Sequence, residues 1–205
     1  CGQCYPCRHG KYNLCEDLKV MGFQTTGVAS HYFAVDAAKV TLLPDDMSYD
    51  EGAMIEPLAV AVHAVKQARD VKGAKIAVLG AGPIGILVAQ AAKGLGAEQV
   101  MITDVSGLRL EKAKECGVDF CVNTRNKDFG EAMTESLGPD KADVIYDCAG
   151  NNITMGQAIK YARKGSIIIL VAVFAGLGQI DLAVLNDHEL DLNTSMMYRN
   201  EDSAL

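Results

Sequence analysis

Apolar residues from position 75 onward fall alternately into short continuous runs and longer stretches with helical spacing. The runs KIAVLG (75–80), QVMITD (99–104) and ADVIYDCAG (142–150) end at Gly or Asp, which is typical of buried strands. The stretch PIGILVAQAAKGLG (83–96) repeats apolar residues at helical spacing and predicts a helix that ends at a glycine. Three more strands are predicted at 119–123, 166–174 and 190–198, and three more helices at 106–117, 127–138 and 152–165.

This alternation of strands and helices predicts an α/β fold with one parallel sheet. Parallel strands joined by helices use right-handed crossovers, which place helices on both faces of the sheet. Six strands of this kind fit the two mononucleotide-binding halves of a Rossmann domain. We therefore expect a doubly wound parallel sheet as the main part of the chain.

The first third of the chain has a different pattern. Residues 19–47 carry short alternating segments broken by Gly and Pro, which predict short antiparallel strands, too few for a self-standing β domain. From Ser48 the spacing becomes helical, and Ser48 with Glu51 forms a capping-box pattern. Pro57 lies inside this stretch, so we expect a helix break or a new helical start there. The predicted domains are 1–47, which includes a cysteine-rich lobe at 1–18, and 48–205.

Composition limits the classes of partner. The 205 residues are 49% hydrophobic and 22% charged, as in a globular protein with a sizeable core. A net charge of −7 without a run of Lys and Arg argues against a nucleic-acid partner, and no apolar run is long enough to predict a membrane partner. Cys116, Cys121 and Cys148 lie scattered in apolar surroundings, which predicts reduced thiols and a cytoplasmic location.

Gly80, Gly82 and Gly85 have the spacing G-x-G-x-x-G between a predicted strand and a predicted helix. In this context the first glycine permits a tight turn, the second admits a pyrophosphate and the third lets the helix pack on the strand. The amides and the positive dipole end of the helix then face the phosphates. The alternative is a glycine turn that binds no ligand.

Asp104 ends the next strand, nineteen residues after Gly85. An acid at this place accepts hydrogen bonds from the adenosine ribose and repels a 2′-phosphate, which favours NAD over NADP. Arg109 lies five residues further on and can pack near the adenosine. The alternative is that Asp104 only caps a helix.

Four of the seven cysteines lie within the first fifteen residues, in the spacing C-x₂-C-x₂-C-x₇-C. Thiolates this close can surround one tetrahedral Zn²⁺, and four cysteine ligands leave no position for water, so we predict a structural zinc site. A disulfide pair and an iron–sulfur cluster are the alternatives. The predicted ligands are Cys1, Cys4, Cys7 and Cys15. His63, on the apolar face of the helix that follows Ser48, is interpreted as a core residue rather than a ligand.

With both motifs, the chain resembles the zinc-containing medium-chain dehydrogenase/reductase family over essentially its whole length. CGQCYPCRHGKYNLC (1–15) looks like the structural-zinc lobe of that family, and GAGPIG (80–85) looks like its NAD turn. EGAMIEPLAVAVHAV (51–65) looks like the segment of its sorbitol (polyol) dehydrogenase branch in which a Glu-Pro pair lies at the catalytic metal. The resemblance implies a partial GroES-like catalytic domain followed by a Rossmann domain.

The resemblance also implies an activity, the oxidation of a secondary alcohol or polyol to a ketone with NAD, assisted by a catalytic zinc that acts as a Lewis acid. Glu56 then lies at this zinc, as a direct ligand or through its water. Pro83 and Ile84 join the glycine turn in the cofactor site. Backbone near the ends of the fourth and fifth strands holds the nicotinamide, which corresponds to Ala149, Gly150, Val171, Ala172 and Val173.

Three further expectations come from the same resemblance. The principal catalytic-zinc ligands of the family, a Cys and a Gly-His-Glu segment, precede its structural lobe, so we expect an internal fragment that is inactive alone. Family members pair through the last Rossmann strand, here near 193–198, which implies a homodimer or homotetramer. A threonine- or butanediol-type dehydrogenase is the alternative within the family, and a non-catalytic nucleotide-binding module is the alternative from another class.

Overall fold

The computed structural model describes residues 1–203 of the chain. The chain forms two compact units, which divide between Glu56 and Pro57. This division lies inside helix α2 (Tyr49–Lys66), nine residues beyond the boundary that the sequence pattern placed at 47/48.

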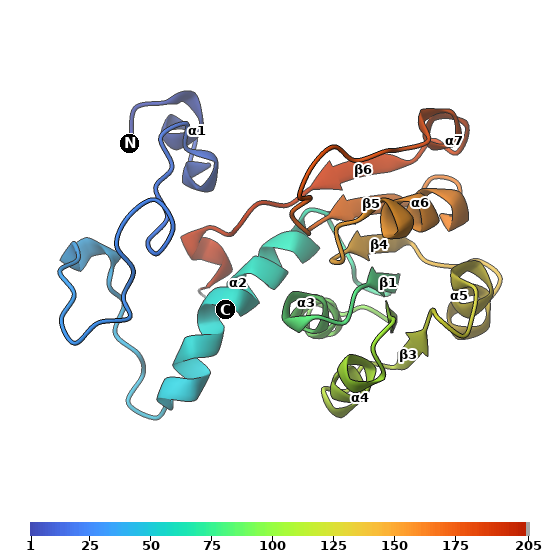
Figure 1. Ribbon diagram of the computed structural model, residues 1–205, viewed down its shortest axis with the longest axis horizontal. Helices are drawn as coiled ribbons and strands as arrows, with labels where there is room; N and C mark the ends of the chain where they lie inside the picture. Colours follow the sequence, from blue (N-terminus) through green and yellow to red (C-terminus); the bar gives the residue numbers. More distant parts are fainter. Residues whose placement is uncertain (204–205) are drawn as a thin grey trace. The chain divides into compact units, whose positions relative to one another are not determined.

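The larger unit is built on six parallel strands in the order β3-β2-β1-β4-β5-β6 (Figure 1). This order confirms the predicted doubly wound sheet, because the chain winds outward from β1 in one direction and from β4 in the other. The chain segments that leave β1 and β4 therefore lead to opposite halves of the sheet. The strands are β1 (Lys75–Leu79), β2 (Gln99–Asp104), β3 (Phe120–Asn123), β4 (Val144–Asp147), β5 (Ile167–Leu170) and β6 (Asp191–Thr194).

Helices cover both faces of this sheet. The alternation of side chains along β1 sends Ile76 and Val78 to one face and Ala77 and Leu79 to the other. The first face packs against α2, α3 (Pro83–Gly94) and α4 (Gly107–Glu115), and the second against α5 (Phe129–Leu137) and α6 (Asn152–Tyr161). Two apolar cores thus hold the sheet between helical layers, and its strand ends stay open for a site.

One helix of the larger unit was absent from the sequence prediction. Helix α7 (Leu182–Asp187) lies between β5 and β6. The carboxylate of Asp181 caps it by accepting hydrogen bonds from the Ala183 and Val184 amides, each at 3.0 Å. An Asp before a short apolar run is a readable start signal for a helix.

A buried ion pair ties the last described helix to α2. Within the 3₁₀ helix η3 (Asn200–Asp202), the Asp202 carboxylate lies 2.8 Å from His63 Nδ1 and accepts from Lys66 Nζ at 3.0 Å. His63 and Asp202 are both buried, which confirms that His63 is a core residue. The sequence pattern gave no sign of its partner, which lies 139 residues further along the chain.

The smaller unit contains three short helices, α1 (Tyr5–Arg8) and the 3₁₀ helices η1 (Tyr12–Leu14) and η2 (Ala37–Lys39). The antiparallel strands predicted at 19–47 are wrong, because the described part of this segment forms one isolated parallel bridge, Met21 to Thr25. An alternating pattern makes a strand only where a neighbouring backbone completes the hydrogen-bond ladder.

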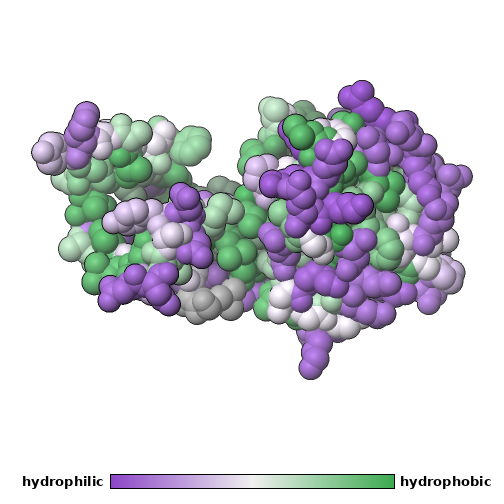
Figure 2. Space-filling model, turned by 90° about the horizontal axis from the view of Figure 1, so that it is seen from below, coloured by the Kyte–Doolittle hydropathy of each residue, from purple (hydrophilic) through white to green (hydrophobic). Residues whose placement is uncertain are grey.

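Apolar side chains of this segment consequently remain at the surface. Figure 2 shows green side chains over much of the smaller unit on the face that is drawn. Tyr32 is 94% exposed, and Phe23 and Leu42 are nearly as exposed.

The break predicted at Pro57 is also wrong, because α2 runs through this residue without interruption. The ring fixes φ near −65°, which a helix accepts, and the cost is the missing hydrogen bond to the carbonyl four residues earlier. That carbonyl belongs to Ala53, which is exposed, so water can satisfy it. The capping box at the start of α2 is confirmed, since Ser48 N and Oγ both donate to the Glu51 carboxylate and Ser48 Oγ accepts from the Glu51 amide.

Within residues 1–203, every helix is too short or too polar to cross a membrane.

Candidate functional site

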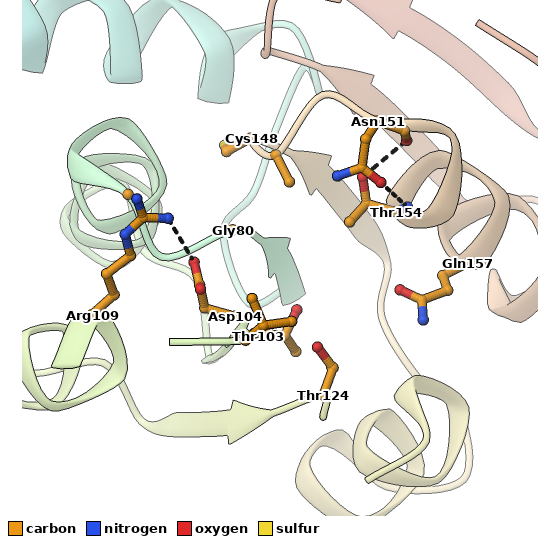
Figure 3. A pocket seen from close by; sticks show the side chains of 12 residues that line it. Gly80, Thr103, Asp104, Arg109, Thr124, Cys148, Asn151, Thr154 and Gln157 are labelled. Atoms are coloured by element: carbon orange, nitrogen blue, oxygen red, sulfur yellow. Dashed lines mark hydrogen bonds and ion pairs between the residues drawn. The ribbon is translucent and has the colours of Figure 1, made fainter. Parts of the chain in front are cut away.

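A pocket of about 290 Å³ opens at the carboxyl ends of the central strands (Figure 3). Figure 3 shows Asp104 with Arg109 on one side and Asn151 with Thr154 on the other. The pocket lies where the strand order reverses between β1 and β4, the place where doubly wound sheets bind ligands. Its lining residues are Gly80, Gly82, Thr103, Asp104, Val105, Arg109, Thr124, Cys148, Ala149, Asn151, Thr154 and Gln157.

The glycine turn between β1 and α3 forms the base of this pocket. Gly80 has φ +99°, a left-handed conformation that favours glycine. A Cβ at Gly85 would lie 1.9 Å from the Gly80 carbonyl oxygen, so only glycine lets the helix approach the turn. A Cβ at Gly82 would meet no atom within 4 Å, which leaves open space beside the backbone for a ligand.

Helix α3 begins directly beyond Gly82 with Pro83 and Ile84. No side chain caps its first turn among the described residues, and Pro83 brings no amide hydrogen of its own. The first amides of a helix need partners, and an anion at this end satisfies them and the helix dipole together. The donor set of the turn therefore fits a phosphate group.

Asp104 ends β2 beside the turn and is 8% exposed. Its Oδ2 accepts from the Ala81 amide at 2.8 Å, and its Oδ1 accepts from the Ser106 amide at 2.8 Å. Each oxygen of a carboxylate offers about two lone-pair positions, so both oxygens can accept one more hydrogen bond. Asp104 thus supports the turn and still has capacity for a ribose hydroxyl.

Arg109 reaches the same carboxylate from the first turn of α4, with Nη1 3.6 Å from Asp104 Oδ2. Its side chain is largely exposed and lines the pocket. The pair holds positive charge at the rim and negative charge at the base, an arrangement that suits a polar ligand with separated charged and hydroxyl groups.

The opposite wall comes from the segment after β4. Ala149, which the sequence predicted, lines the pocket together with Asn151 and Thr154, which it did not. The Asn151 side chain caps α6 by accepting from the Ile153 and Thr154 amides at 2.9 and 3.0 Å. An Asn before a helical stretch is a readable cap signal, whereas the facing position of Thr124 and Gln157 depends on how β3 and α6 pack.

Seven predicted cofactor residues lie outside the pocket lining, namely Pro83, Ile84, Gly85, Gly150, Val171, Ala172 and Val173. Val171, Ala172 and Val173 follow β5, and the first two donate their amides to the Asp147 carbonyl, each at 3.0 Å. A Cβ at Gly150 would lie 2.8 Å from the Ala172 Cβ, so the segments after β4 and β5 touch. Val173 is 88% exposed.

The four cysteines of the first fifteen residues form a separate cluster in the smaller unit. The sulfur atoms of Cys1, Cys4, Cys7 and Cys15 all lie within 4.8 Å of one another, as free thiols. Sulfurs in a tetrahedral zinc site lie about 3.8 Å apart, given a Zn–S distance of about 2.3 Å. The cluster therefore fits zinc after a small contraction.

Local structure brings these sulfurs together. Cys4 is the N-cap of helix α1 and Cys7 lies within its single turn, and Gly2 and Gly10 bend the chain with φ of +74° and +72°. Backbone hydrogen bonds to the sulfur, first from Glu16 and then from Cys7, lower the pKa of the Cys4 thiol to about 7. A thiolate is the form that binds a metal.

Glu56 lies on α2 at the surface. Across residues 1–203, the cysteine cluster is the one group of three or more potential metal ligands, so Glu56 belongs to no such group in this part of the chain. Its position on a helix that continues through Pro57 places it at the division between the two units.

Comparisons with known proteins agree with this arrangement of elements. Residues 83–204 match the family model described as zinc-binding dehydrogenase, and residues 1–45 match the alcohol dehydrogenase GroES-like domain. The sorbitol dehydrogenase of Bacillus subtilis (strain 168) is 34% identical over 203 residues, which are 98% of this chain and 57% of that protein. The chain thus spans little more than half the length of this relative.

Two solved structures are similar over almost the whole chain. An alcohol dehydrogenase from Escherichia coli CFT073, crystallised with NADH, has a TM-score of 0.91 and 30% identity over 98% of this chain and 60% of that one. A zinc-binding dehydrogenase from Sinorhizobium meliloti 1021, bound to NADP, has a TM-score of 0.92 and 28% identity over 99% of this chain and 60% of that one.

Proposed function

Because the chain belongs to the zinc-binding dehydrogenase family, we propose that it serves an oxidoreductase that transfers hydride from a secondary alcohol or polyol to NAD. NAD supplies the hydride acceptor when it is bound. The residues of this chain bind and orient that cofactor.

The observation that carries the proposal is the pocket at the switch point of the sheet. It combines a glycine turn open at Gly82, an uncapped helix start and a buried acid at the end of β2. The turn and the helix start would hold the pyrophosphate, and Asp104 would accept hydrogen bonds from the adenosine ribose. These two contacts would hold the adenosine half and the pyrophosphate of a dinucleotide.

We propose NAD rather than NADP as the cofactor. A 2′-phosphate would meet the negative charge of Asp104 in a nearly dry place, where repulsion is poorly screened. The similar structures include one with NADH and one with NADP, so the choice rests on this chain's own carboxylate. Arg109 at the rim moderates this repulsion only partly, because its side chain is largely in solvent.

We also propose two roles for zinc. The cysteine cluster would hold a structural zinc, since four thiolates leave it no open position. Glu56 would contribute to a catalytic zinc, which polarises the alcohol oxygen in enzymes of this kind. Relatives named as sorbitol dehydrogenase and L-idonate 5-dehydrogenase support a polyol or a related hydroxy acid as substrate.

The test is alcohol-dependent reduction of NAD⁺, followed at 340 nm in the protein that carries residues 1–205. A panel of secondary alcohols and polyols is offered with NAD⁺ or NADP⁺, and the Glu56→Ala variant is compared with Glu98→Ala, a surface control. We expect polyol oxidation with NAD⁺, a loss of kcat in Glu56→Ala of at least about 100-fold and no loss in the control. Turnover that prefers NADP⁺, or that is indifferent to Glu56, would contradict the proposal.

A further inference from the structure

Asp147, the last residue of β4, is completely buried directly behind the pocket wall. Its Oδ1 accepts hydrogen bonds from the amides of Ala149 at 3.0 Å and Gly150 at 3.2 Å. These amides belong to the turn that leaves β4, and Ala149 lines the pocket. The carboxylate therefore fixes the shape of this turn.

The same oxygen also holds the first turn of α6. Thr154 Oγ1 lies 3.1 Å from Asp147 Oδ1 and 3.1 Å from the Asn151 carbonyl oxygen, so its one hydrogen is shared between these two acceptors. Thr154 lines the pocket, as Figure 3 shows. One buried atom thus connects the turn after β4 with a side chain on the opposite wall from Asp104.

The backbone of Asp147 extends this connection to the neighbouring strand. Its carbonyl oxygen accepts from the amides of Val171 and Ala172 at 3.0 Å each, directly after β5. The side chain and the carbonyl of Asp147 therefore hold both segments that the sequence predicted at the nicotinamide. Gly80 packs against the same place, because a Cβ there would lie 3.1 Å from the Ala149 nitrogen.

The second carboxylate oxygen of Asp147 indicates that this arrangement does more than stabilise the fold. Oδ2 is buried and has no hydrogen-bond partner among residues 1–203. A buried polar atom without a partner costs free energy, and an apolar side chain of similar shape would avoid that cost. What only a carboxylate or its amide can supply here is the Oδ1 acceptor for three donors.

We propose that Asp147 is a positioning residue for the nicotinamide cofactor, acting through the turn at Ala149 and Gly150 and through Thr154. This inference rests on the proposed function, in which the pocket binds NAD. Asp147 itself lies behind the wall and touches no ligand space.

The test compares NADH affinity and thermal unfolding in four variants of the 205-residue chain. Asp147→Ala removes all three hydrogen bonds, and Asp147→Asn keeps the oxygen that accepts them. Thr154→Val removes one hydroxyl at nearly constant volume. Asp143→Ala is the matched control, because Asp143 precedes β4 at its opposite end and bonds the Lys75 amide and Arg163.

We expect Asp147→Ala to weaken NADH binding at least about tenfold, because three donors of the pocket wall lose their acceptor. Asp147→Asn should stay within about threefold of the wild type, and Thr154→Val should lie between the two. Asp143→Ala should unfold at a lower temperature and bind NADH like the wild type. Equal affinity of Asp147→Ala and wild type, or equal losses in Asp147→Ala and Asp143→Ala, would overturn the proposal.

Hydrogen exchange separates this inference from the proposed function. In the free protein, Asp147→Ala should speed exchange of the Ala149 and Gly150 amides, and Asp143→Ala should not. If the wild type fails to bind NADH, the proposed function is wrong, and unchanged exchange at these amides rejects the positioning role as well. If Asp147→Ala does not fold, unchanged NADH affinity in Thr154→Val is the result that overturns the proposal.

Discussion

Asp104 and Asp147 end two strands of one sheet, but they differ in their hydrogen-bond partners and nearby charges. Both oxygens of Asp104 accept an amide hydrogen bond, and Arg109 lies nearby. Asp147 uses only one oxygen and has no cation beside it in the described contacts. The first carboxylate has partners on both oxygens and can serve a ligand, whereas burial makes a charge on the second costly.

This contrast predicts a pH effect at Asp147. Burial raises the pKa of Asp147, although the Ala149 and Gly150 amides and Thr154 oppose the shift. The folded protein then binds this proton more tightly than the unfolded chain, so its contribution to stability is present at low pH. The contribution is lost as the pH rises from the ordinary carboxyl pKa of about 4 through the folded value.

Asp147→Asn removes the titrating group. As the pH rises through this window, the free energy of unfolding of the wild type should therefore fall relative to that of the variant. Urea unfolding of both proteins between pH 4 and pH 8 measures the difference. A difference that does not change with pH would mean that Asp147 has the same pKa in both states.

At the scale of elements, α2 and η3 are joined by a buried ion pair that the local pattern could not reveal. Asp202 is 3% exposed, and its carboxylate meets His63, Lys66 and the Arg199 amide. Burial alone would raise the pKa of Asp202, but these hydrogen bonds outweigh it and lower the pKa. The pair therefore stabilises the fold above the ordinary carboxyl pKa and loses its effect as the pH falls through the folded value.

Asp202→Ala should lower the free energy of unfolding by about 3 kcal/mol at pH 7, because it leaves His63 and Lys66 without their partner. The loss should shrink below about pH 4, because the unfolded wild-type chain then takes up a proton on this carboxyl and the folded protein does so only at lower pH. Glu201→Ala is the control, since its exposed pair with Arg199 is worth under about 1 kcal/mol. Equal losses of free energy of unfolding in Asp202→Ala and Glu201→Ala at pH 7 would show that the buried carboxylate contributes no more than the pair of Arg199 with Glu201.

The elements that the sequence predicted well are those whose signals are local. Six strands and the helices α3 to α6 follow from apolar runs, helical spacing and terminal glycines, and the register of the sheet then brings Gly80 and Asp104 together. The antiparallel strands predicted at 19–47 are wrong because an alternating pattern alone does not show whether a partner strand exists. The helix break predicted at Pro57 is wrong because a proline inside a helix is tolerated where the freed carbonyl reaches water.

In the whole molecule, the two units hold different candidate sites. The unit 1–56 holds the cysteine cluster and Glu56, and the unit that begins at Pro57 holds the dinucleotide pocket. Sequence motifs predicted Gly80, Gly82 and Asp104, which line the pocket, and the four cysteines that lie together. They could not locate Asp147, Asn151, Thr154 or Gln157, because these residues gain their roles only when β4 and α6 are placed beside β1.

The central claim is that the pocket beside the glycine turn binds NAD and that Asp104 selects it over NADP. Calorimetric titration of the 205-residue chain with NADH and with NADPH, in wild type and Asp104→Ser, tests it most directly. We expect one NADH site per chain, NADPH affinity at least about tenfold weaker and a smaller gap in Asp104→Ser. Absence of NADH binding, or equal affinity of the wild type for both nucleotides, would contradict the account.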